Sequence, residues 1–179
     1  MGEIASEIEG MRAFTDRRIP VSVTLSAGYP YTPFLCNIEP DGMMRDQVLE
    51  AFAAGASGVI IYSEGWFDAL DMRYFAEAMR SVMKAEDVFA DGIPLLAGEL
   101  VDVTSQTFVK GVRRDETVVV LVSEYSSRMI VARIKFRADR PLTVTNLSTG
   151  QIVKRCEPGE NEFEVVLTEE RAVLFKIAP

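Results

Sequence analysis

Residues 47–62 read QVLEAFAAGASGVIIY, and this stretch decides the fold class. The apolar side chains of residues 44–52 recur at helical spacing, which predicts a helix that runs to about Ala54. Gly55 follows directly, at the position where a glycine commonly ends a helix. Residues 58–62 are then apolar along their whole length, which is typical of a parallel strand buried on both faces.

Elements of the same two kinds flank this stretch. Residues 3–14 carry apolar side chains at helical spacing with acids between them, and residues 20–25 are short and β-branched, as in a strand. A further helix is predicted over about 70–86. The order helix, strand, helix, strand, helix is a repeating β/α pattern.

The second half of the chain has a different pattern, with a junction near residues 91–95. Short β-rich segments alternate there with turn signals, and no helix is expected beyond residue 90. The predicted strands are 118–122, 129–136, 142–146, 151–155, 162–167 and 172–177. We therefore predict an α/β segment over residues 1–92, followed by an antiparallel β-sandwich domain over residues 93–179.

The composition excludes several classes of function. The 179 residues carry a formal net charge of −8, and no basic stripe is present, which argues against a nucleic-acid partner. No run of about 18 apolar residues is present, so no membrane-spanning helix is expected, and residues 1–10 do not resemble a signal peptide. The compartment stays open.

The reactive residue types narrow the chemistry further. The sequence contains no histidine, which excludes Ser-His-Asp and Cys-His catalysis and the usual histidine-containing zinc sites within this chain. Cys36 and Cys156 lie far apart and are interpreted as packed or idle thiols. There is no phosphate loop, metal signature or dinucleotide fingerprint, so no cofactor is expected.

The first half has too few strands for a finished sheet. Two or three strands with three helices leave an exposed edge, which proteins usually cover. We expect the missing strands to come from upstream in the same polypeptide or from a partner subunit.

Two stretches carry a resemblance to a known family. The first is Glu39-Pro40-Asp41 leading into residues 47–62, and the second is the ending from Gly111, which includes the hairpin sequence NLSTGQ at 146–151 and the last strand VLFKI at 173–177. Together they resemble the last units of a (β/α)8-barrel glycoside hydrolase followed by its C-terminal β domain. The resemblance implies that residues 20–26 and 58–63 are the seventh and eighth barrel strands. Residues 1–92 are too few for a whole barrel of roughly 200–250 residues.

In such barrels the active site lies at the carboxyl ends of the strands. Glycoside hydrolysis needs two carboxyl groups, and aromatic rings pack against sugars. The resemblance therefore implies Glu64 as the candidate catalytic carboxylate, with Glu39 as a weaker one. The candidate substrate-binding residues are Tyr62, Trp66, Tyr29 and Tyr31. Asp41 and Asp68 precede strong helices and are better explained as helix caps than as catalysts.

Three functional hypotheses follow. The first is the C-terminal portion of a carbohydrate-active hydrolase, inactive as an isolated fragment, whose partners would be a carbohydrate substrate and the missing barrel strands. The second is a non-catalytic module that binds carbohydrate or protein. The third is an α/β protein of unknown function that completes its sheet by oligomerising.

Overall fold

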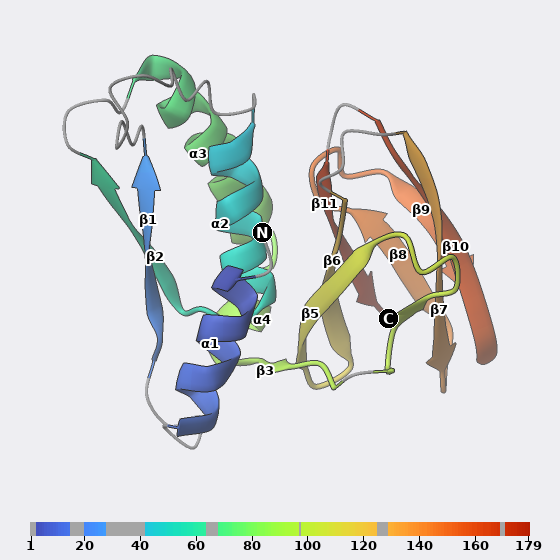
Figure 1. The fold of residues 1–179 in the computed structure, drawn as a ribbon. Helices are drawn as coiled ribbons and strands as arrows, with labels where there is room; N and C mark the ends of the chain where they lie inside the picture. Colours follow the sequence, from blue (N-terminus) through green and yellow to red (C-terminus); the bar gives the residue numbers. More distant parts are fainter. Residues whose placement is uncertain are drawn as a thin grey trace.

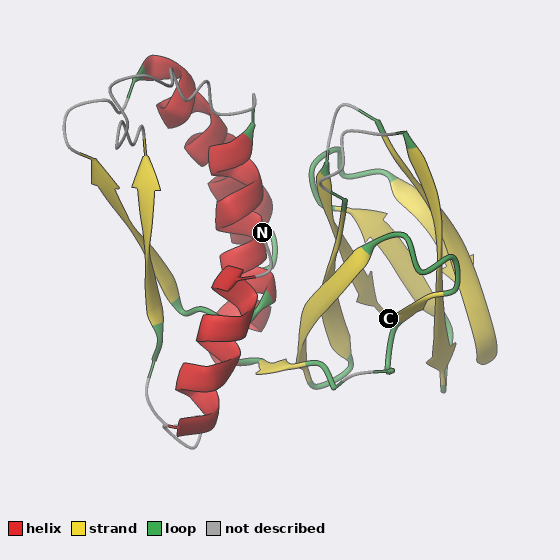
Figure 2. Ribbon diagram, viewed as in Figure 1, coloured by secondary structure: helices red, strands yellow, loops and turns green. Residues whose placement is uncertain are grey.

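The chain is arranged in four layers, which a computed structural model describes over residues 3–14, 20–27, 42–63, 68–96, 98–124, 129–168 and 171–179. Figure 1 shows a two-stranded sheet, then a layer of helices, then two facing sheets. The change from mixed to purely β structure along the chain is plain in Figure 2. The predicted fold class, β/α units followed by an antiparallel β sandwich, is confirmed.

The α/β part has a short parallel sheet covered by helices. Its described elements are α1 (Glu3–Phe14), β1 (Ser22–Ala27), α2 (Met43–Ala53), β2 (Gly58–Ser63), α3 (Ala69–Met83) and α4 (Glu86–Asp91). β1 and β2 pair in parallel, with Val23 opposite Val59 and Ala27 opposite Ser63. Both predicted strands are therefore present, but the prediction that residues 58–62 are buried on both faces is wrong, because Ile60 and Tyr62 are exposed on one face. Within the described ranges, no helix is both long and apolar enough to cross a membrane.

The helix ends differ from the predictions in two places. Gly42, with a φ of 83°, occupies the N-cap position of α2, one residue after the predicted cap Asp41, which lies outside the described residues. A glycine adopts the left-handed conformation at little cost, so the chain can turn into the helix at Gly42. The predicted helix over 70–86 is interrupted after Met83, and the short helix α4 follows from Glu86. Gly55, with a φ of 95°, follows α2 as predicted.

The β part consists of two sheets packed face to face. Its described strands are β3 (Ile93–Pro94), β4 (Val101–Asp102), β5 (Phe108–Arg114), β6 (Thr117–Ser123), β7 (Ile130–Ala138), β8 (Leu142–Asn146), β9 (Ile152–Cys156), β10 (Gly159–Leu167) and β11 (Ala172–Ala178). The larger sheet has the order β3-β5-β6-β11-β8-β9, and the smaller sheet has the order β10-β7-β4. All six predicted strands are present.

β5 is a full strand that the sequence analysis did not predict. Lys110, Gly111 and two arginines interrupt its apolar pattern. Gly111 is nevertheless required, because a Cβ atom there would lie 2.5 Å from the Val119 carbonyl oxygen on β6. The close approach of two backbones thus explains a glycine that looks like a strand breaker in the sequence.

Strands β6 and β11 are apolar on both faces because each lies between two layers. Val119 and Leu121 of β6 join the cluster formed with the helices, whereas Val118, Val120 and Val122 join the sandwich core. β11 divides in the same way, since Leu174 faces the helices and Phe175 faces the sandwich. The larger sheet is therefore the shared wall of two cores.

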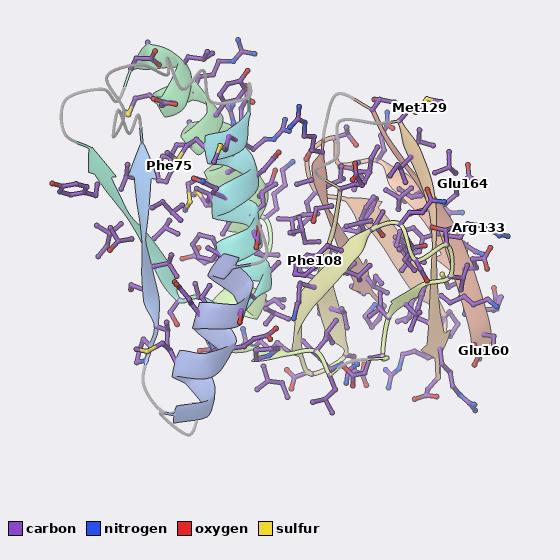
Figure 3. The ribbon with its side chains drawn as sticks, viewed as in Figure 1. Phe75, Phe108, Met129, Arg133, Glu160 and Glu164 are labelled. Carbon is purple, nitrogen blue, oxygen red and sulfur yellow. The ribbon has the colours of Figure 1, made fainter. Side chains whose placement is uncertain are left out.

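The smaller sheet has one buried face and one solvated face. Along β7, which contains the predicted strand 129–136, buried and exposed residues alternate strictly. Arg133 lies opposite Glu164, and Arg137 lies opposite Glu160, on the exposed face of β7 and β10. Figure 3 shows Arg133, Glu160 and Glu164 on this outer side. Cross-strand charge pairs of this kind stabilise a solvated sheet surface.

The division into residues 1–92 and 93–179 stays a prediction, and the apolar core is continuous across it. Val88 and Phe89 of α4 belong to the same buried cluster as Val112 and Val119 of the larger sheet. Arg114 lies 3.5 Å from the carboxylates of both Asp87 and Asp91 in α4. The helices thus bury the near face of the larger sheet.

The turn that follows β4 is organised by one buried carboxylate. Asp102, only 6% exposed, accepts hydrogen bonds from the backbone N–H groups of Thr104, Gln106 and Thr107 at 2.8–3.0 Å. The hydroxyl groups of Thr104 and Thr107 also donate to it, at 2.7 and 2.8 Å. Burial acts to raise the pKa of Asp102, but these hydrogen bonds outweigh it and lower the pKa from 3.8 to about 2.

We predict that Asp102 makes a pH-dependent contribution to stability. Because its pKa is lower in the folded chain, the contribution is complete above about pH 5 and is lost as the pH falls through about 2. The difference in unfolding free energy between the wild type and Asp102→Asn should shrink by about 2 kcal/mol between pH 6 and pH 2. Urea denaturation at several pH values measures it. Asp139→Asn, whose side chain is exposed, is the control, and a pH-independent difference for Asp102→Asn would contradict the prediction.

The junction between α4 and β3 gives a second prediction. A Cβ atom at Gly92 would lie 2.3 Å from the Val88 carbonyl oxygen and 2.9 Å from that of Arg113. Backbone atoms cannot move aside cheaply, so Gly92→Ala should lower the unfolding free energy by about 3 kcal/mol or more. Gly10→Ala in α1, where nothing lies within 4 Å, should be neutral or stabilising by up to about 1 kcal/mol. Equal stability of the two variants in urea would show that the junction is not tightly packed.

Candidate functional site

The candidate site begins at the edge where the two parallel strands end together. Ala27, the last residue of β1, is paired with Ser63, the last residue of β2. Because the strands are parallel, both carboxyl ends lie at the same edge of the sheet. In open α/β sheets and in barrels, ligands bind at this edge. The ends of β1 and β2 therefore lie next to each other, at the edge of the sheet where a binding site is expected.

One face of this sheet is covered by helices. Leu25 belongs to the buried cluster formed with α2, α3 and α4, and Val23, Val59 and Ile61 pack against that cluster. α1 closes the same side near the start of β1, where its buried Ile8 joins a cluster with Val21. Along each strand, the residues that face the helices alternate with the residues that face the opposite side of the sheet.

The opposite face of the sheet is open. Ile60 is 57% exposed and Tyr62 is 48% exposed, and their register partners on β1 are Thr24 and Ser26. Ser22 and Thr24 are also exposed. A face with an apolar side chain, an aromatic ring and small hydroxyl groups is suited to contact a further layer or a sugar ring. In a closed barrel this face would be the interior.

Tyr62 is the one candidate residue that the described part of the chain contains. It lies one residue before the end of β2, on the open face. Glu64, Trp66, Glu39, Tyr29 and Tyr31 lie outside the described residues. The assignment of catalytic and substrate-binding roles to these residues stays a prediction.

Asp68, which follows this segment, has a structural role, as predicted. Its carboxylate accepts hydrogen bonds from the backbone N–H groups of Leu70, at 2.7 Å, and Asp71, at 3.0 Å. The Asp71 carboxylate accepts in return from the N–H of Asp68, at 3.3 Å. This reciprocal capping box fixes the first turn of α3 just beyond the candidate loop. Asp68 is thereby committed to the helix end.

The structure also contains buried acids that the sequence analysis missed. Asp46 and Glu50 lie one turn apart on α2 and are almost completely buried. Asp46 accepts two hydrogen bonds of 3.0 Å from the guanidinium group of Arg45, which compensates its charge. The sequence holds one signal for the burial of Asp46 and Glu50: both acids lie in a mainly apolar helix, and such a helix is expected to be covered on several sides. The described ranges contain no group of three or more Asp, Glu, Cys or His side chains able to hold a metal ion.

The described cysteine is a core residue. Cys156, at the end of β9, is a free and buried thiol in the sandwich core. Burial raises the pKa of this thiol, while nearby Lys154 acts in the opposite direction. A thiol that resists ionisation is a poor nucleophile, so Cys156 fits the predicted packed role. Cys36 lies outside the described residues.

Comparison with known sequences gives no match. No protein-family profile matches this chain, and neither does any curated protein.

Solved structures of glycoside hydrolases are similar to this chain. A GH30 endoxylanase from Clostridium papyrosolvens has a TM-score of 0.55 over 96% of this chain and 46% of its own, at 10% identity. An α-amylase from Geobacillus thermoleovorans has a TM-score of 0.54 over 78% of this chain and 34% of its own, at 13% identity. A GH27 β-L-arabinopyranosidase from Geobacillus stearothermophilus has a TM-score of 0.52 over 78% of this chain and 30% of its own, at 13% identity.

At these identities the likeness concerns the fold alone. The chain spans 30–46% of the length of these three enzymes. The resemblance stated from the sequence is therefore confirmed at the level of the fold: this chain has the fold of part of a glycoside hydrolase, with β/α units followed by a β sandwich.

Proposed function

We propose that this chain is a portion of a carbohydrate-active hydrolase and forms one wall of its sugar-binding site. The observation that carries the proposal is the pair of parallel strands that end together, with a helix-covered face and an open face that presents Tyr62. This arrangement belongs to a fold that the chain shares with parts of an endoxylanase, an α-amylase and an arabinopyranosidase.

The sheet supports the idea that the site is completed by further strands. Among the described residues, β1 pairs only with β2, so each strand has one unpaired edge. Unpaired edges and an apolar open face are normally covered in a finished protein. Further β/α units, from the same polypeptide or from a partner subunit, would pair with these edges and enclose the open face.

The proposed roles follow from the position of each residue in the sequence. Glu64 comes directly after Ser63, the last residue of β2, and is the proposed catalytic carboxyl group, with Glu39 as the weaker alternative. Tyr62 would present its ring to a sugar, as would Trp66, Tyr29 and Tyr31. The second carboxyl group that glycoside hydrolysis requires would come from the missing units.

A non-catalytic binding module is less well supported. Such a module would display aromatic rings on its sandwich, but Phe136, Phe163 and Phe175 are buried and contact one another edge to face, with centroid separations of 6.1 and 5.2 Å. Phe108 is partly buried and packs against the small cluster that contains Ile8 of α1 and Val21. Tyr125 lies outside the described residues. Within the part of the sandwich that the structure describes, no line of exposed aromatic rings is present.

The first test concerns sugar binding by the open face. We expect xylo- or malto-oligosaccharides to bind weakly, with a Kd in the millimolar range, because only one wall of the site is present. Tyr62→Ala should weaken binding roughly two- to tenfold, since an aromatic contact contributes about 0.5–1.5 kcal/mol. NMR titration with each oligosaccharide measures the affinity. Met129→Ala removes another exposed apolar side chain, outside this sheet, and should have no effect; an equal loss in both variants, or no binding, would contradict the proposal.

The second test concerns catalysis. We expect no turnover of aryl glycosides by the isolated chain, because a single positioned carboxyl group cannot act as both acid and nucleophile. Release of nitrophenol from xyloside, glucoside and arabinopyranoside substrates can be followed by absorbance. Turnover that disappears in Glu64→Gln would instead show that this chain holds a complete site. Light scattering distinguishes a monomer from a chain that completes its sheet by oligomerising.

A further inference from the structure

A basic cleft lies on the other side of the helix layer, away from the open sheet face. It has a volume of about 810 Å³ and is bordered by α2, α3 and Ser148 in the turn between β8 and β9. Four of its lining side chains are basic, namely Arg45, Arg73, Arg80 and Lys84, and one, Glu77, is acidic. In a protein with a net charge of −8, this local excess of positive charge is unusual.

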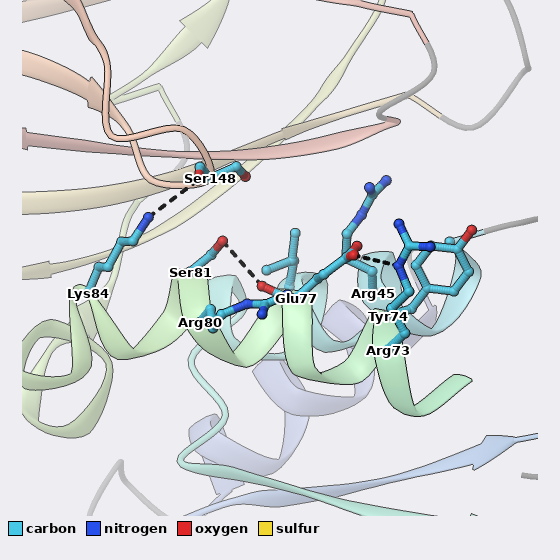
Figure 4. Close-up of a pocket in the computed structure, with 10 residues that line it drawn as sticks. Arg45, Arg73, Tyr74, Glu77, Arg80, Ser81, Lys84 and Ser148 are labelled. Atoms are coloured by element: carbon cyan, nitrogen blue, oxygen red, sulfur yellow. Dashed lines mark hydrogen bonds and ion pairs between the residues drawn. The ribbon is translucent and has the colours of Figure 1, made fainter. Parts of the chain in front are cut away.

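The wall of the cleft is one face of α3. Arg73, Glu77, Arg80 and Lys84 follow one another at intervals of three or four residues, which places them in a row along the helix. The eleven steps from Arg73 to Lys84 span roughly 16 Å along the helix axis, so the row forms a long wall rather than a single point of contact. Figure 4 shows these side chains along α3, with Lys84 pointing towards Ser148 across the cleft.

Part of the positive charge is already compensated. The Arg73 Nε atom donates to Glu77 at 2.9 Å, and this contact raises the pKa of Arg73. Arg45 binds the buried Asp46. The charges of the remaining two basic residues are the ones available to a ligand.

Arg80 and Lys84 are not neutralised within the described chain. Lys84 donates to the carbonyl oxygens of Leu147 and Ser148, the latter at 3.3 Å, and these acceptors carry no formal charge. Arg80 has no hydrogen bond or ion pair to any described residue. The two side chains lie one turn apart on the same face, so a ligand with several anionic oxygens could contact both.

Neutral donors lie beside these charges. Ser81, between Arg80 and Lys84 in sequence, has its hydroxyl group 3.5 Å from the Glu77 carbonyl oxygen, a weak contact that a stronger acceptor could replace. Ser148 forms the opposite rim of the cleft. Two cationic groups with hydroxyl groups between them form a set of donors that suits an oxyanion.

We propose that this cleft binds a small ligand with several anionic oxygens, a phosphate ester or a polycarboxylate, held mainly by Arg80 and Lys84. The site is separate from the proposed sugar-binding face, because the helix layer lies between them (Figure 1). Its occupation would also link α3 to the β8–β9 turn, and so would bind the helix layer to the sandwich.

The test is a calorimetric titration with inorganic phosphate and with citrate at low ionic strength. We expect saturable binding of at least one of them, weakened about tenfold or more in Arg80→Gln and again in Lys84→Gln, because each removes a charge-assisted contact. Affinity should also fall as sodium chloride is raised from about 50 to 300 mM. A preference for phosphate would indicate a phosphate ester, and a preference for citrate would indicate a polycarboxylate.

Two controls separate this site from general attraction. Arg137→Gln removes an exposed arginine from the outer face of the smaller sheet and should leave binding unchanged. Tyr62→Ala should also leave it unchanged, so a failure of the sugar site would not affect this result. Absence of saturable binding, full affinity in Arg80→Gln, or an equal loss in Arg137→Gln would overturn the proposal. Since Arg80 is exposed, its replacement should not impair folding, which circular dichroism verifies.

Discussion

The structure depends on the fact that β6 and β11 are apolar on both faces. β6 places a valine and a leucine in the helix-side cluster and three valines in the sandwich core. β11 places an alanine and a leucine in the helix-side cluster, and a valine, a phenylalanine and an isoleucine in the sandwich core. A sheet with two apolar faces must be covered on both, since each exposed apolar face would forfeit the stabilisation of its burial. The smaller sheet covers one face and the helices α2, α3 and α4 cover the other. The α/β part is therefore held to the sandwich by a packed core as well as by the chain connection at Gly92.

The two-stranded sheet of β1 and β2 is an exception to this rule, because only one of its faces is covered. β1 and β2 are covered by helices on one face, while Ile60 and Tyr62 are exposed on the other. The open face of the smaller sheet combines cross-strand charge pairs, such as Arg133 and Glu164, with a few exposed valines. The open face of β1 and β2 has no charged residue, and it offers hydroxyl groups, an isoleucine and a tyrosine. A solvated surface does not need such residues, whereas a further layer or a ligand does. This contrast within one molecule supports the proposal that the sheet is one part of a larger site.

Most of the fold could be predicted from the sequence, because its periodicities are strong. Residues 58–62 form the predicted parallel strand, and all six strands predicted for the sandwich are present. The prediction that residues 58–62 are buried on both faces is wrong, because Ile60 and Tyr62 are exposed on one face. β5 was missed because the requirement for Gly111 comes from the backbone of β6, a contact between segments that no local pattern contains. The burial of Asp46 and Glu50 was missed for a related reason. Their helix is covered by sheets, α1 and α3, and such all-round burial depends on tertiary structure.

The candidate site was less predictable than the fold, and the helix layer shows why. The sequence analysis searched for chemistry at strand ends, where Tyr62 does lie on an open face. It found no basic stripe, yet α3 and its C-cap Lys84 align Arg73, Arg80 and Lys84 on one wall, and α2 adds Arg45 to the same cleft. Such an assembly depends on which face of each helix points towards the sandwich, and this follows from the packing on β6 and β11. The strands that hold the molecule together therefore also decide that the helix layer has an open, neutral sheet on one side and a basic cleft on the other.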